Sequence, residues 1–207
     1  MADQREEKMN NPSTIRAATP ADYPALYRIC LQTAHAGQDA TALYSDPEYP
    51  GQRFAVPYAR FAPDFAFVLD VGGEVMGYVV AAPDTRAFEA RLNESWWPAL
   101  QEQYRQRQPE APLDGNLLNS IRHPDTAAEE LVSDWPAHLH INLLPAQQKG
   151  GWGRKMIEHQ LNALRAAGVC GVHLGVSLQN EQVCAFYERM GFRPLLRSNA
   201  IYMGQLL

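Results

Sequence analysis

Cysteine is scarce in this sequence, and its spacing argues against two common ways of stabilising a small protein. The 207 residues contain three cysteines, Cys30, Cys170 and Cys184, and no CxxC pair. An odd number without paired spacing is atypical of a disulfide framework and of a structural zinc site, so we predict no metal. Free thiols are typical of a reducing compartment, and we expect a cytoplasmic protein.

Long apolar runs and an excess of basic residues are also lacking. Lysine and arginine number 18 against 23 aspartates and glutamates, which gives a formal net charge of -5 at pH 7. Nucleic acid is not expected as a partner, because non-specific binding depends on basic side chains that neutralise phosphates. No apolar run is long enough to span a bilayer, so no membrane partner is expected.

What is present is the composition of an ordinary globular domain. Hydrophobic residues make up 46% of the chain and charged residues 20%, which is enough to bury a sizeable core. The polar start of the chain has no apolar signal region, and we interpret residues 1–12 as a flexible tail. We expect one domain over residues 13–207, with an insertion at about 83–134.

Periodicity predicts strands and helices in mixed order. In the first half we expect a strand at 14–17, a helix that begins near Thr19, loop with short helical pieces at 34–60, and a hairpin about Gly72 and Gly73. The second half is predicted to alternate strands (137–144, 171–177, 200–206) with two helices. One follows Gly153 and stops at Gly168, and the other covers 180–190. Strand–helix–strand units pair in parallel and hairpins antiparallel, so we predict a mixed sheet in an α/β fold.

The expected insertion is predicted to be helical from about 85 to 106 and irregular from 109 to 124, where proline, glycine and asparagine are frequent. Thr126, followed three residues later by Glu129, is typical of a capping box at a short helix. The aromatic residues of the insertion recur at helical spacing. That spacing is typical of core packing, with a place in a cleft as the alternative, and the residues are Phe88, Trp96, Trp97 and Tyr104.

The densest glycines lie at the beginning of a predicted helix, in the segment QQKGGWGRK, residues 147–155. A helix N-terminus presents unpaired N–H groups and partial positive charge, and glycine lets backbone approach an anion closely. The pattern Gln148-x-x-Gly151-x-Gly153, followed by Arg154 and Lys155, therefore favours a phosphate-binding loop. A plain strand–helix turn is the alternative, since the segment is neither a Walker A sequence nor GxGxxG.

A second polar and aromatic group follows some thirty residues later. Asn180 precedes a helix that carries Phe186 and Tyr187 and ends in the letters MGF. Tyr187 falls on the apolar stripe of that helix, so one role for it is core packing with a satisfied hydroxyl. The other role is a phenol that donates a proton to a leaving thiolate.

Together these two segments resemble motifs A and B of the GNAT superfamily of acyl-CoA N-acyltransferases. Q-x-x-G-x-G at 148–153 is similar to the pyrophosphate loop of that family, and N-x-x-x-x-x-F-Y-x-x-x-G-F at 180–192 to its second CoA-contacting helix. The resemblance covers about residues 139 to 195. Residues 77–100 and 136–145 further resemble a bacterial branch related to the acetyltransferase-like C-terminal domain of O-GlcNAc hydrolases.

The resemblance implies a GNAT-like fold whose central parallel strands splay apart, with a helical insertion, and acetyl-CoA as co-substrate. It implies that backbone groups of Leu143 and Leu144 pair with the pantetheine arm. It also implies that Asn180 contacts the pantetheine or the start of the helix, and that Phe186 packs by the cofactor. Tyr187 would protonate the departing sulfur. The pyrophosphate would lie against the loop and the start of its helix, formed by Gln148, Lys149, Gly150, Gly151, Trp152, Gly153 and Arg154, with Trp152 packing outward beside the cofactor.

The general base is the least determined part of the expected site. His138, His140 and Asn142 share one face of the strand before the loop. His140 can accept a proton at neutral pH, with a structural, hydrogen-bonded histidine as its alternative role. Asn142 can only orient a water or a substrate. Asp84 either meets the substrate amine or, as the simpler role, caps the helix after it.

We expect an enzyme, an N-acetyltransferase that transfers acetyl from acetyl-CoA to a primary amine by direct attack in a ternary complex. The acceptor is expected to be a small molecule or a peptide, and the insertion is expected to cover its side of the site. A catalytically inactive acetyl-CoA-binding sensor is the main alternative, because the cofactor strand carries no Asp or Glu. A nucleotide-binding domain is the third. Neither the acceptor nor the oligomeric state follows from the sequence.

Overall fold

The structure, a computed structural model, describes residues 12–207, so the expected tail lies, apart from Pro12, outside the described residues. Seven strands form one mixed sheet in the order β1-β2-β3-β4-β5-β7-β6. All neighbouring strands are antiparallel except β4 and β5. The strands are β1 (Ser13–Ala17), β2 (Ala66–Val71), β3 (Glu74–Ala82), β4 (Ala137–Leu143), β5 (Gly171–Val176), β6 (Arg193–Arg197) and β7 (Ile201–Leu206).

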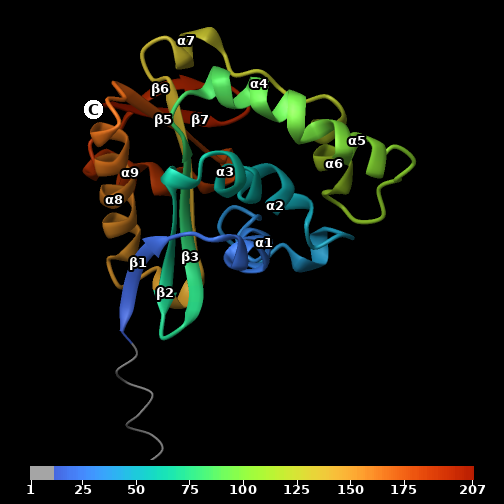
Figure 1. Cartoon of the computed structure of the whole chain (residues 1–207), viewed down its shortest axis with the longest axis horizontal. Helices are drawn as coiled ribbons and strands as arrows, with labels where there is room; N and C mark the ends of the chain where they lie inside the picture. Colours follow the sequence, from blue (N-terminus) through green and yellow to red (C-terminus); the bar gives the residue numbers. More distant parts are fainter. Residues whose placement is uncertain (1–11) are drawn as a thin grey trace, which may run out of the picture.

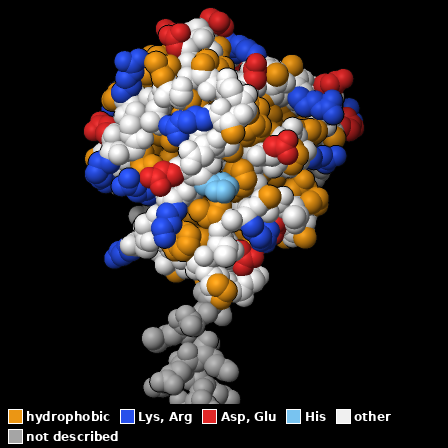
Figure 2. Space-filling model, turned by 60° about the vertical axis from the view of Figure 1, so that its left-hand side comes forward, with side chains coloured by type: hydrophobic (Ala, Val, Ile, Leu, Met, Phe, Trp, Pro, Cys, Tyr) orange, Lys and Arg blue, Asp and Glu red, His pale blue; other side chains and the backbone are white. Residues whose placement is uncertain are grey.

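Helices cover both faces of the sheet, with α1–α3 on one side and α8 and α9 on the other (Figure 1). A helical arm, α4–α6, runs outward from one end of the sheet on the side of α1–α3. The helices are α1 (Tyr23–Leu31), α2 (Tyr49–Phe54), α3 (Val56–Phe61), α4 (Thr85–Ser95), α5 (Trp97–Gln103), α6 (Asp114–Arg122), α7 (Glu129–Val132), α8 (Trp152–Ala166) and α9 (Cys184–Arg189). Figure 2 brings the α8 side forward and shows charges of both signs interspersed with apolar side chains.

The two parallel strands separate soon after they meet. Their register comprises two pairs, Ala137 with Val172 and His138 with His173. Strand β4 continues to Leu143 and stays paired with β3 along its length, while β5 continues to Val176 against β7. The expected splay of the central strands is thus present, and it leaves a gap between the carboxyl halves of β4 and β5.

The alternation of residues on β4 sorts its side chains onto two faces, as predicted. Leu139, Ile141 and Leu143 pack on the α8 side, where the apolar stripe Ile157, Leu161 and Leu164 is buried. His138, His140 and Asn142 point to the opposite side, among α1–α3. The largest apolar cluster lies on this second side, between the sheet, α1–α3 and the arm.

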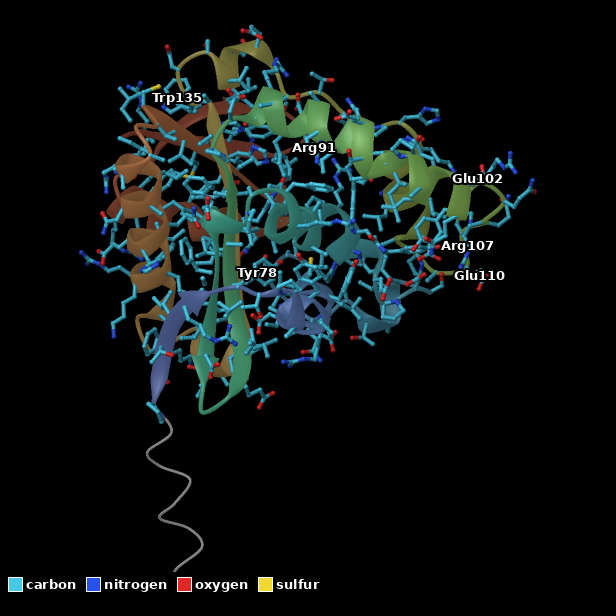
Figure 3. All side chains as sticks on the ribbon, in the orientation of Figure 1. Tyr78, Arg91, Glu102, Arg107, Glu110 and Trp135 are labelled. Atoms are coloured by element: carbon cyan, nitrogen blue, oxygen red, sulfur yellow. The ribbon has the colours of Figure 1, made fainter. Side chains whose placement is uncertain are left out.

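The arm is part of this core through its aromatic residues. Trp96, Trp97 and Tyr104 are all buried, so the simpler of their two predicted roles is confirmed. The indole N–H of Trp96 donates to the carbonyl of Gln52 at 2.9 Å, which ties the arm to α2. Figure 3 shows Glu102, Arg107 and Glu110 at the far tip of the arm, and Tyr78 where the sheet meets the helices.

One prediction for an irregular segment is confirmed and another needs correction. Residues 34–60 contain the short helical pieces expected there, α2 and α3, which follow each other with Ala55 between them. Residues 109–124, predicted to be irregular, contain α6. Its Asp114 is fully buried and accepts hydrogen bonds from the N–H groups of Ser45, Glu110 and Ala111. These tertiary partners, which composition does not reveal, organise the segment.

One predicted cap is present and another is not. The Asp84 carboxylate accepts from the N–H of Ala87 at 2.9 Å and caps α4. The capping box at Thr126 is wrong: α7 begins at Glu129, with Ala128 as its N-cap. The reason is tertiary, because the N–H of Ala127 donates to Glu89 at 2.7 Å and the Glu129 carboxylate accepts from Arg86.

Among residues 12–207, no helix has both the length and the apolar character needed to cross a bilayer. Within the same range, no three His, Cys, Asp or Glu side chains gather closely enough to hold a metal ion.

Candidate active site

A cleft of about 740 Å³ opens in the gap between the splayed strands. Four segments form its walls: α1 with the turn after it, the α2 end, the strand pair β4 and β5, and the loops that lead into α8 and α9. Eight of the predicted site residues line it. They are His140, Asn142, Leu143, Gln148, Gly153, Asn180, Phe186 and Tyr187.

The backbone of β4 offers hydrogen-bonding groups to this gap. In the antiparallel ladder with β3, the N–H of Leu144 donates to Met76 at 3.0 Å. Because the direction of backbone groups alternates along a strand, Asn142 and His140 also face β3, whereas Ile141 and Leu143 face the gap. Leu144 is engaged twice, since its carbonyl accepts from Gln147. These two hydrogen bonds favour Ile141 over Leu144 as a partner for a pantetheine arm, and the expected pairing of Leu144 stays a prediction.

The glycine-rich loop turns sharply into α8. Gly151 is the N-cap of the helix and has a left-handed backbone, φ 74°, which favours glycine because a Cβ would be strained there. A Cβ on Gly153 would lie 3.5 Å from Phe186 and 3.6 Å from Leu143, an ordinary contact distance. The fold itself therefore does not require glycine at 153, which fits a position kept small for a ligand that approaches the backbone.

The polar residues of the loop differ in what they contact. Gln148 donates to the carbonyl of Leu143 at 3.0 Å and so joins the loop to the gap edge of β4. Lys149 and Gly150 are exposed. Arg154 is exposed as well and pairs with Glu158 at 2.8 Å. All of these lie at the start of α8, where a helix of 15 residues presents its positive end.

Trp152 packs back onto the sheet. It is half-buried against the apolar cluster that includes Leu143 and Met156, and the Lys155 ammonium lies 4.3 Å from its ring centroid. Trp152 is not among the residues that line the cleft. The tryptophan therefore anchors the first turn of α8, and the expected position beside the cofactor stays a prediction.

Tyr187 and its neighbours form the α9 wall. The Tyr187 ring packs edge-on against Phe186 and Phe192, with centroids 5.2 and 5.8 Å away. Burial raises the pKa of Tyr187 to about 12, so the phenol keeps its proton throughout the physiological range. Asn180 has a non-helical backbone and lies against the Gly37 turn of the opposite wall.

A hydrogen-bonded chain fixes the two histidines of β4. The Thr85 hydroxyl donates to the carbonyl of Pro136 at 2.7 Å, so it can only accept from His138 Nδ1, also at 2.7 Å. His138 Nε2 must then accept, and its donor is the Tyr58 hydroxyl at 2.7 Å. Tyr58 accepts in turn from His140 Nε2 at 3.0 Å. The tautomer of His140 follows: Nε2 carries the proton and Nδ1 carries a lone pair.

Both histidines are held neutral. Burial, followed by the positive charge of Arg53 and by His173, lowers the pKa of His140 to about 4. Burial also lowers the pKa of His138 well below 6.5, with His140 and His173 adding to the effect. His140 is therefore a hydrogen-bond acceptor at neutral pH, and a base only for a weakly held proton.

Asn142 is held from both ends. Its side-chain oxygen accepts from the Tyr78 hydroxyl at 2.9 Å, and its amide nitrogen donates to Thr33 at 2.7 Å. The Thr33 hydroxyl itself donates to the carbonyl of Ile29 at 2.7 Å. This arrangement joins β3, β4 and α1 across the floor of the cleft and fits an orienting role, not a base.

Several residues of the site had no signal that could reveal them from the sequence. Tyr58 and Phe54 lie in the weakly periodic segment expected to be loop, and they reach His140 only through the packing of α2 and α3. The expected insertion does not line the cleft. The insertion contacts residues outside the cleft lining. Its Thr85 hydroxyl is hydrogen-bonded to His138, and its Phe88 ring stacks on Tyr58 with centroids 4.5 Å apart. Asp84, the helix cap, also lies outside the cleft lining.

Splayed parallel strands, a glycine loop that opens a helix and a protonated phenol facing the gap are together the features of a GNAT-type acyltransferase. The family model described as Acetyltransferase (GNAT) family matches residues 25–192. The chain belongs to this family, and acetyl-CoA is its co-substrate, as expected from the sequence.

Two relatives show how far the similarity extends. The chain is 22% identical over 181 residues to Protein O-GlcNAcase of Rattus norvegicus, which covers 86% of this chain and 20% of that protein. It is 30% identical over 173 residues to mycothiol acetyltransferase of Beutenbergia cavernae, which covers 80% of this chain and 53% of that protein. The chain thus spans about a fifth and about half of the length of these relatives.

Solved structures agree with the fold. SsHAT superposes with a TM-score of 0.86 at 37% identity, covering 94% of this chain and 98% of that chain. The structure of yncA, a putative acetyltransferase from Salmonella typhimurium with its cofactor acetyl-CoA, gives a TM-score of 0.55 at 16% identity, covering 95% of each chain. The family resemblance, the mixed α/β fold class and the likeness to O-GlcNAc hydrolases are therefore confirmed.

Proposed function

We propose that this protein is an active N-acetyltransferase that moves acetyl from acetyl-CoA to a primary amine by direct attack in a ternary complex. The observation that carries the proposal is that Tyr187 and His140 line the same cleft. One is a phenol that keeps its proton, and the other is an imidazole with a lone pair on Nδ1. These are the two proton-transfer partners that acyl transfer to an amine needs.

The residues that would hold acetyl-CoA form one continuous edge. The backbone groups of Ile141 and the N–H of Leu143 face the gap and would pair with the amides of the pantetheine arm, while the Leu143 carbonyl already accepts from Gln148. The first turn of α8, with Gly151 and Gly153, would accept the pyrophosphate, because helix N-termini favour anions. Holding thioester and amine together lowers the barrier through orientation, and a backbone N–H of β4 would polarise the thioester carbonyl.

The alternative is an acetyl-CoA-binding protein without turnover. The cofactor strand carries no carboxylate, and the histidine that replaces it has its pKa lowered to about 4. Such a histidine is a weak base for an ammonium. It is an adequate base for the nitrogen of the tetrahedral adduct, because that nitrogen is more acidic after it has added to the thioester carbonyl than the free ammonium is.

The test is amine-dependent turnover by the full chain. Acetyl-CoA is incubated with a panel of primary amines, and free CoA and acetylated product are separated by chromatography, because the exposed Cys170 would react with thiol reagents. For Tyr187→Phe we expect kcat to fall by about 100-fold or more, with the Kd of acetyl-CoA unchanged in calorimetry. Tyr202→Phe, at a tyrosine on β7 outside the cleft lining, is the matched control.

Two results would contradict the proposal. Binding of acetyl-CoA without amine-dependent CoA release would favour the sensor. Protection of the fold against heat by ATP but not by CoA would favour a nucleotide-binding domain.

A further inference from the structure

The walls of the cleft are electrically neutral in the part of the chain that the structure describes. The ionisable side chains among the lining residues are Cys30, Tyr44, His140 and Tyr187. Burial raises the pKa of Cys30 and of Tyr187 to about 12, raises that of Tyr44, and lowers that of His140 to about 4. All four are therefore uncharged at pH 7, and the other lining residues carry no ionisable group.

The charge that acts on His140 itself is the positive one of Arg53, while the Glu89 carboxylate of α4 acts on the neighbouring Tyr58 and His173 and does not line the cleft. The residues around its ring are Tyr58 from α3, Arg53 and Phe54 from α2, His138 on β4 and His173 on β5. Among them only Arg53 is charged at pH 7. Its guanidinium pairs at 3.3 Å with Asp125, a carboxylate that is largely exposed. An ammonium that entered the cleft would lose hydration without gaining a counter-ion, which is costly.

From this neutrality, and resting on the acetyl transfer proposed above, we infer the class of acceptor. The acceptor is a weakly basic primary amine, such as the α-amine of a peptide or the amine of an amino sugar, that enters the cleft already uncharged. The ε-amine of lysine is disfavoured as an acceptor.

The size of the effect follows from how much of each amine is neutral at pH 7. A lysine amine with a pKa of about 10.4 is uncharged in roughly one molecule in 2,500, and an α-amine with a pKa of about 7.7–8.0 in roughly one in ten. For an enzyme that binds only the neutral amine, the concentration of usable acceptor at pH 7 is therefore roughly 250 times higher with the α-amine than with the lysine amine. The greater nucleophilicity of the more basic amine offsets part of this factor.

The transfer balances with a neutral amine and these two side chains. The amine nitrogen forms a bond to the acyl carbon as the carbon–sulfur bond breaks. The nitrogen loses a proton to His140 Nδ1, and the sulfur gains one from the Tyr187 hydroxyl. Solvent returns a proton to Tyr187 and removes one from His140. An ammonium acceptor must lose an additional proton beforehand, and a histidine with a pKa of about 4 does not take it.

The experiment compares matched acceptors with wild-type protein and saturating acetyl-CoA. The probes are an alanine-terminated peptide without lysine, glucosamine, and Nα-acetyl-lysine amide, whose only amine is on the side chain. At pH 7 we expect kcat/KM for the peptide or for glucosamine to exceed that of the lysine analogue by at least about 10-fold. The first two arms distinguish peptide from sugar sources. With rising pH, kcat/KM should level off near pH 8 for the weak bases and continue to rise to about pH 10 for lysine.

A binding measurement gives a readout that does not depend on turnover. In the presence of CoA, calorimetry at pH 7 should detect the peptide amine at lower concentration than the lysine analogue. The variant Asn142→Asp places a carboxylate in the cleft while keeping an acceptor for Tyr78. We expect it to raise the kcat/KM of the lysine analogue relative to the peptide by about 5-fold or more. Thermal unfolding of the variant establishes that it is folded.

The outcomes separate this inference from the function on which it rests. If the lysine analogue is acetylated at pH 7 at least as efficiently as both weak bases, the transferase stands and the inference fails. If no amine releases CoA although acetyl-CoA binds, the proposed transferase fails together with the inference. An unchanged preference in Asn142→Asp would contradict the role assigned to the neutral wall.

Discussion

The Tyr58 hydroxyl bridges two histidines, His138 and His140, and its hydrogen bonds fix which ring nitrogen of each carries the proton. Tyr58 donates to His138 and accepts from His140, and the direction of the whole chain is imposed by Thr85, whose proton is committed to the carbonyl of Pro136. The result is a fixed tautomer of His140, a residue that lines the cleft, with the lone pair on Nδ1. Tyr58 does not line the cleft, so it is a positioning residue.

Replacing Tyr58 with Phe should therefore change catalysis without changing cofactor binding. The variant leaves two histidine nitrogens without their partner and frees the tautomer of His140. We expect kcat to fall about 10-fold, the KM for acetyl-CoA to stay constant, and the free energy of unfolding to drop by about 1–3 kcal/mol. The nitrogen NMR shifts of His140 should report a mixture of tautomers, which a merely structural role would not produce.

Tyr49→Phe is the matched control, because Tyr49 is as deeply buried and its hydroxyl has no hydrogen-bond partner among the described residues. Its removal should leave both kcat and stability almost unchanged. Equal losses of kcat and stability in the two variants would show that removing any buried tyrosine hydroxyl has this effect. They would contradict a specific role for the hydrogen bonds to the histidines.

Single residues were predictable where a motif gave them a position. Gln148, Gly153 and Tyr187 lie in the expected cleft because the spacing of both motifs carries structural meaning. Tyr58 was not predictable, because it meets His140 only through contacts across 82 positions of sequence. Local periodicity contains no information on such a contact.

Helix α8 ends in a left-handed glycine at both termini, which makes it possible to separate stability from binding. Gly151 has φ 74° and Gly168 has φ 76°, and a Cβ on either would meet nothing within 4 Å. Alanine should therefore destabilise the protein by a similar amount, about 1 kcal/mol, at each position. We expect Gly151→Ala alone to raise the Kd of acetyl-CoA, by about 5-fold or more, because it alone lies at the end of α8 where the pyrophosphate is proposed to bind.

Calorimetry of acetyl-CoA binding and urea unfolding of both variants measure the two effects. Similar Kd values in Gly151→Ala and Gly168→Ala would argue that the glycine loop is only a turn, the alternative that its sequence left open.

Elements with strong local signals were predicted, and elements organised by tertiary contacts were not. The hairpin about Gly72 and Gly73 follows from two β-rich runs and two residues with positive φ. Helix α6 was missed because its first residue, Asp114, draws hydrogen bonds from Ser45, which is 69 residues distant. The capping box predicted at Thr126 is absent for a similar reason, because Ala127 and Glu129 are hydrogen-bonded to residues of α4.

At the scale of the molecule, buried neutral histidines predict sensitivity to acid. The pKa of His140 is about 4 in the folded protein and about 6.5 when unfolded. The unfolded state then binds more protons, so stability is fully present above pH 6.5 and is lost as pH falls toward 4. For His140 alone we expect a loss of about 1–2 kcal/mol between pH 7 and pH 5. His138 and His173 act in the same direction.

Urea unfolding at pH 7 and pH 5 checks this expectation, and His140→Gln should reduce the difference by about the same 1–2 kcal/mol. The exposed His123, replaced in the same way, is the control. The Asp22 carboxylate, paired with Arg16, has a pKa of about 2 and loses its contribution only below pH 4, outside this window. A stability that is flat from pH 7 to pH 5 would contradict the burial of neutral imidazoles.

The splay of β4 and β5 could be predicted only through resemblance. It is a relation between two strands some 35 residues apart, and each strand by itself has an ordinary pattern of alternation or burial. The resemblance did not extend to the wall opposite the glycine loop, which is supplied by α1, the turn after it and the end of α2, and not by the insertion. The inferred preference for weakly basic amines therefore rests on the charges of the cleft and not on the resemblance.

Beyond His138 and His173, no strand among residues 12–207 pairs with β4 on the β5 side, so the hydrogen-bonding edge of β4 is open there. A pantetheine arm along Ile141 and Leu143 would pair with this open edge as a short additional strand. Acetyl-CoA should therefore slow amide hydrogen exchange at these two residues by about 10-fold or more. The amide of Leu144, already bonded to Met76, should respond little. Uniform slowing along β4 would instead indicate general stiffening of the fold.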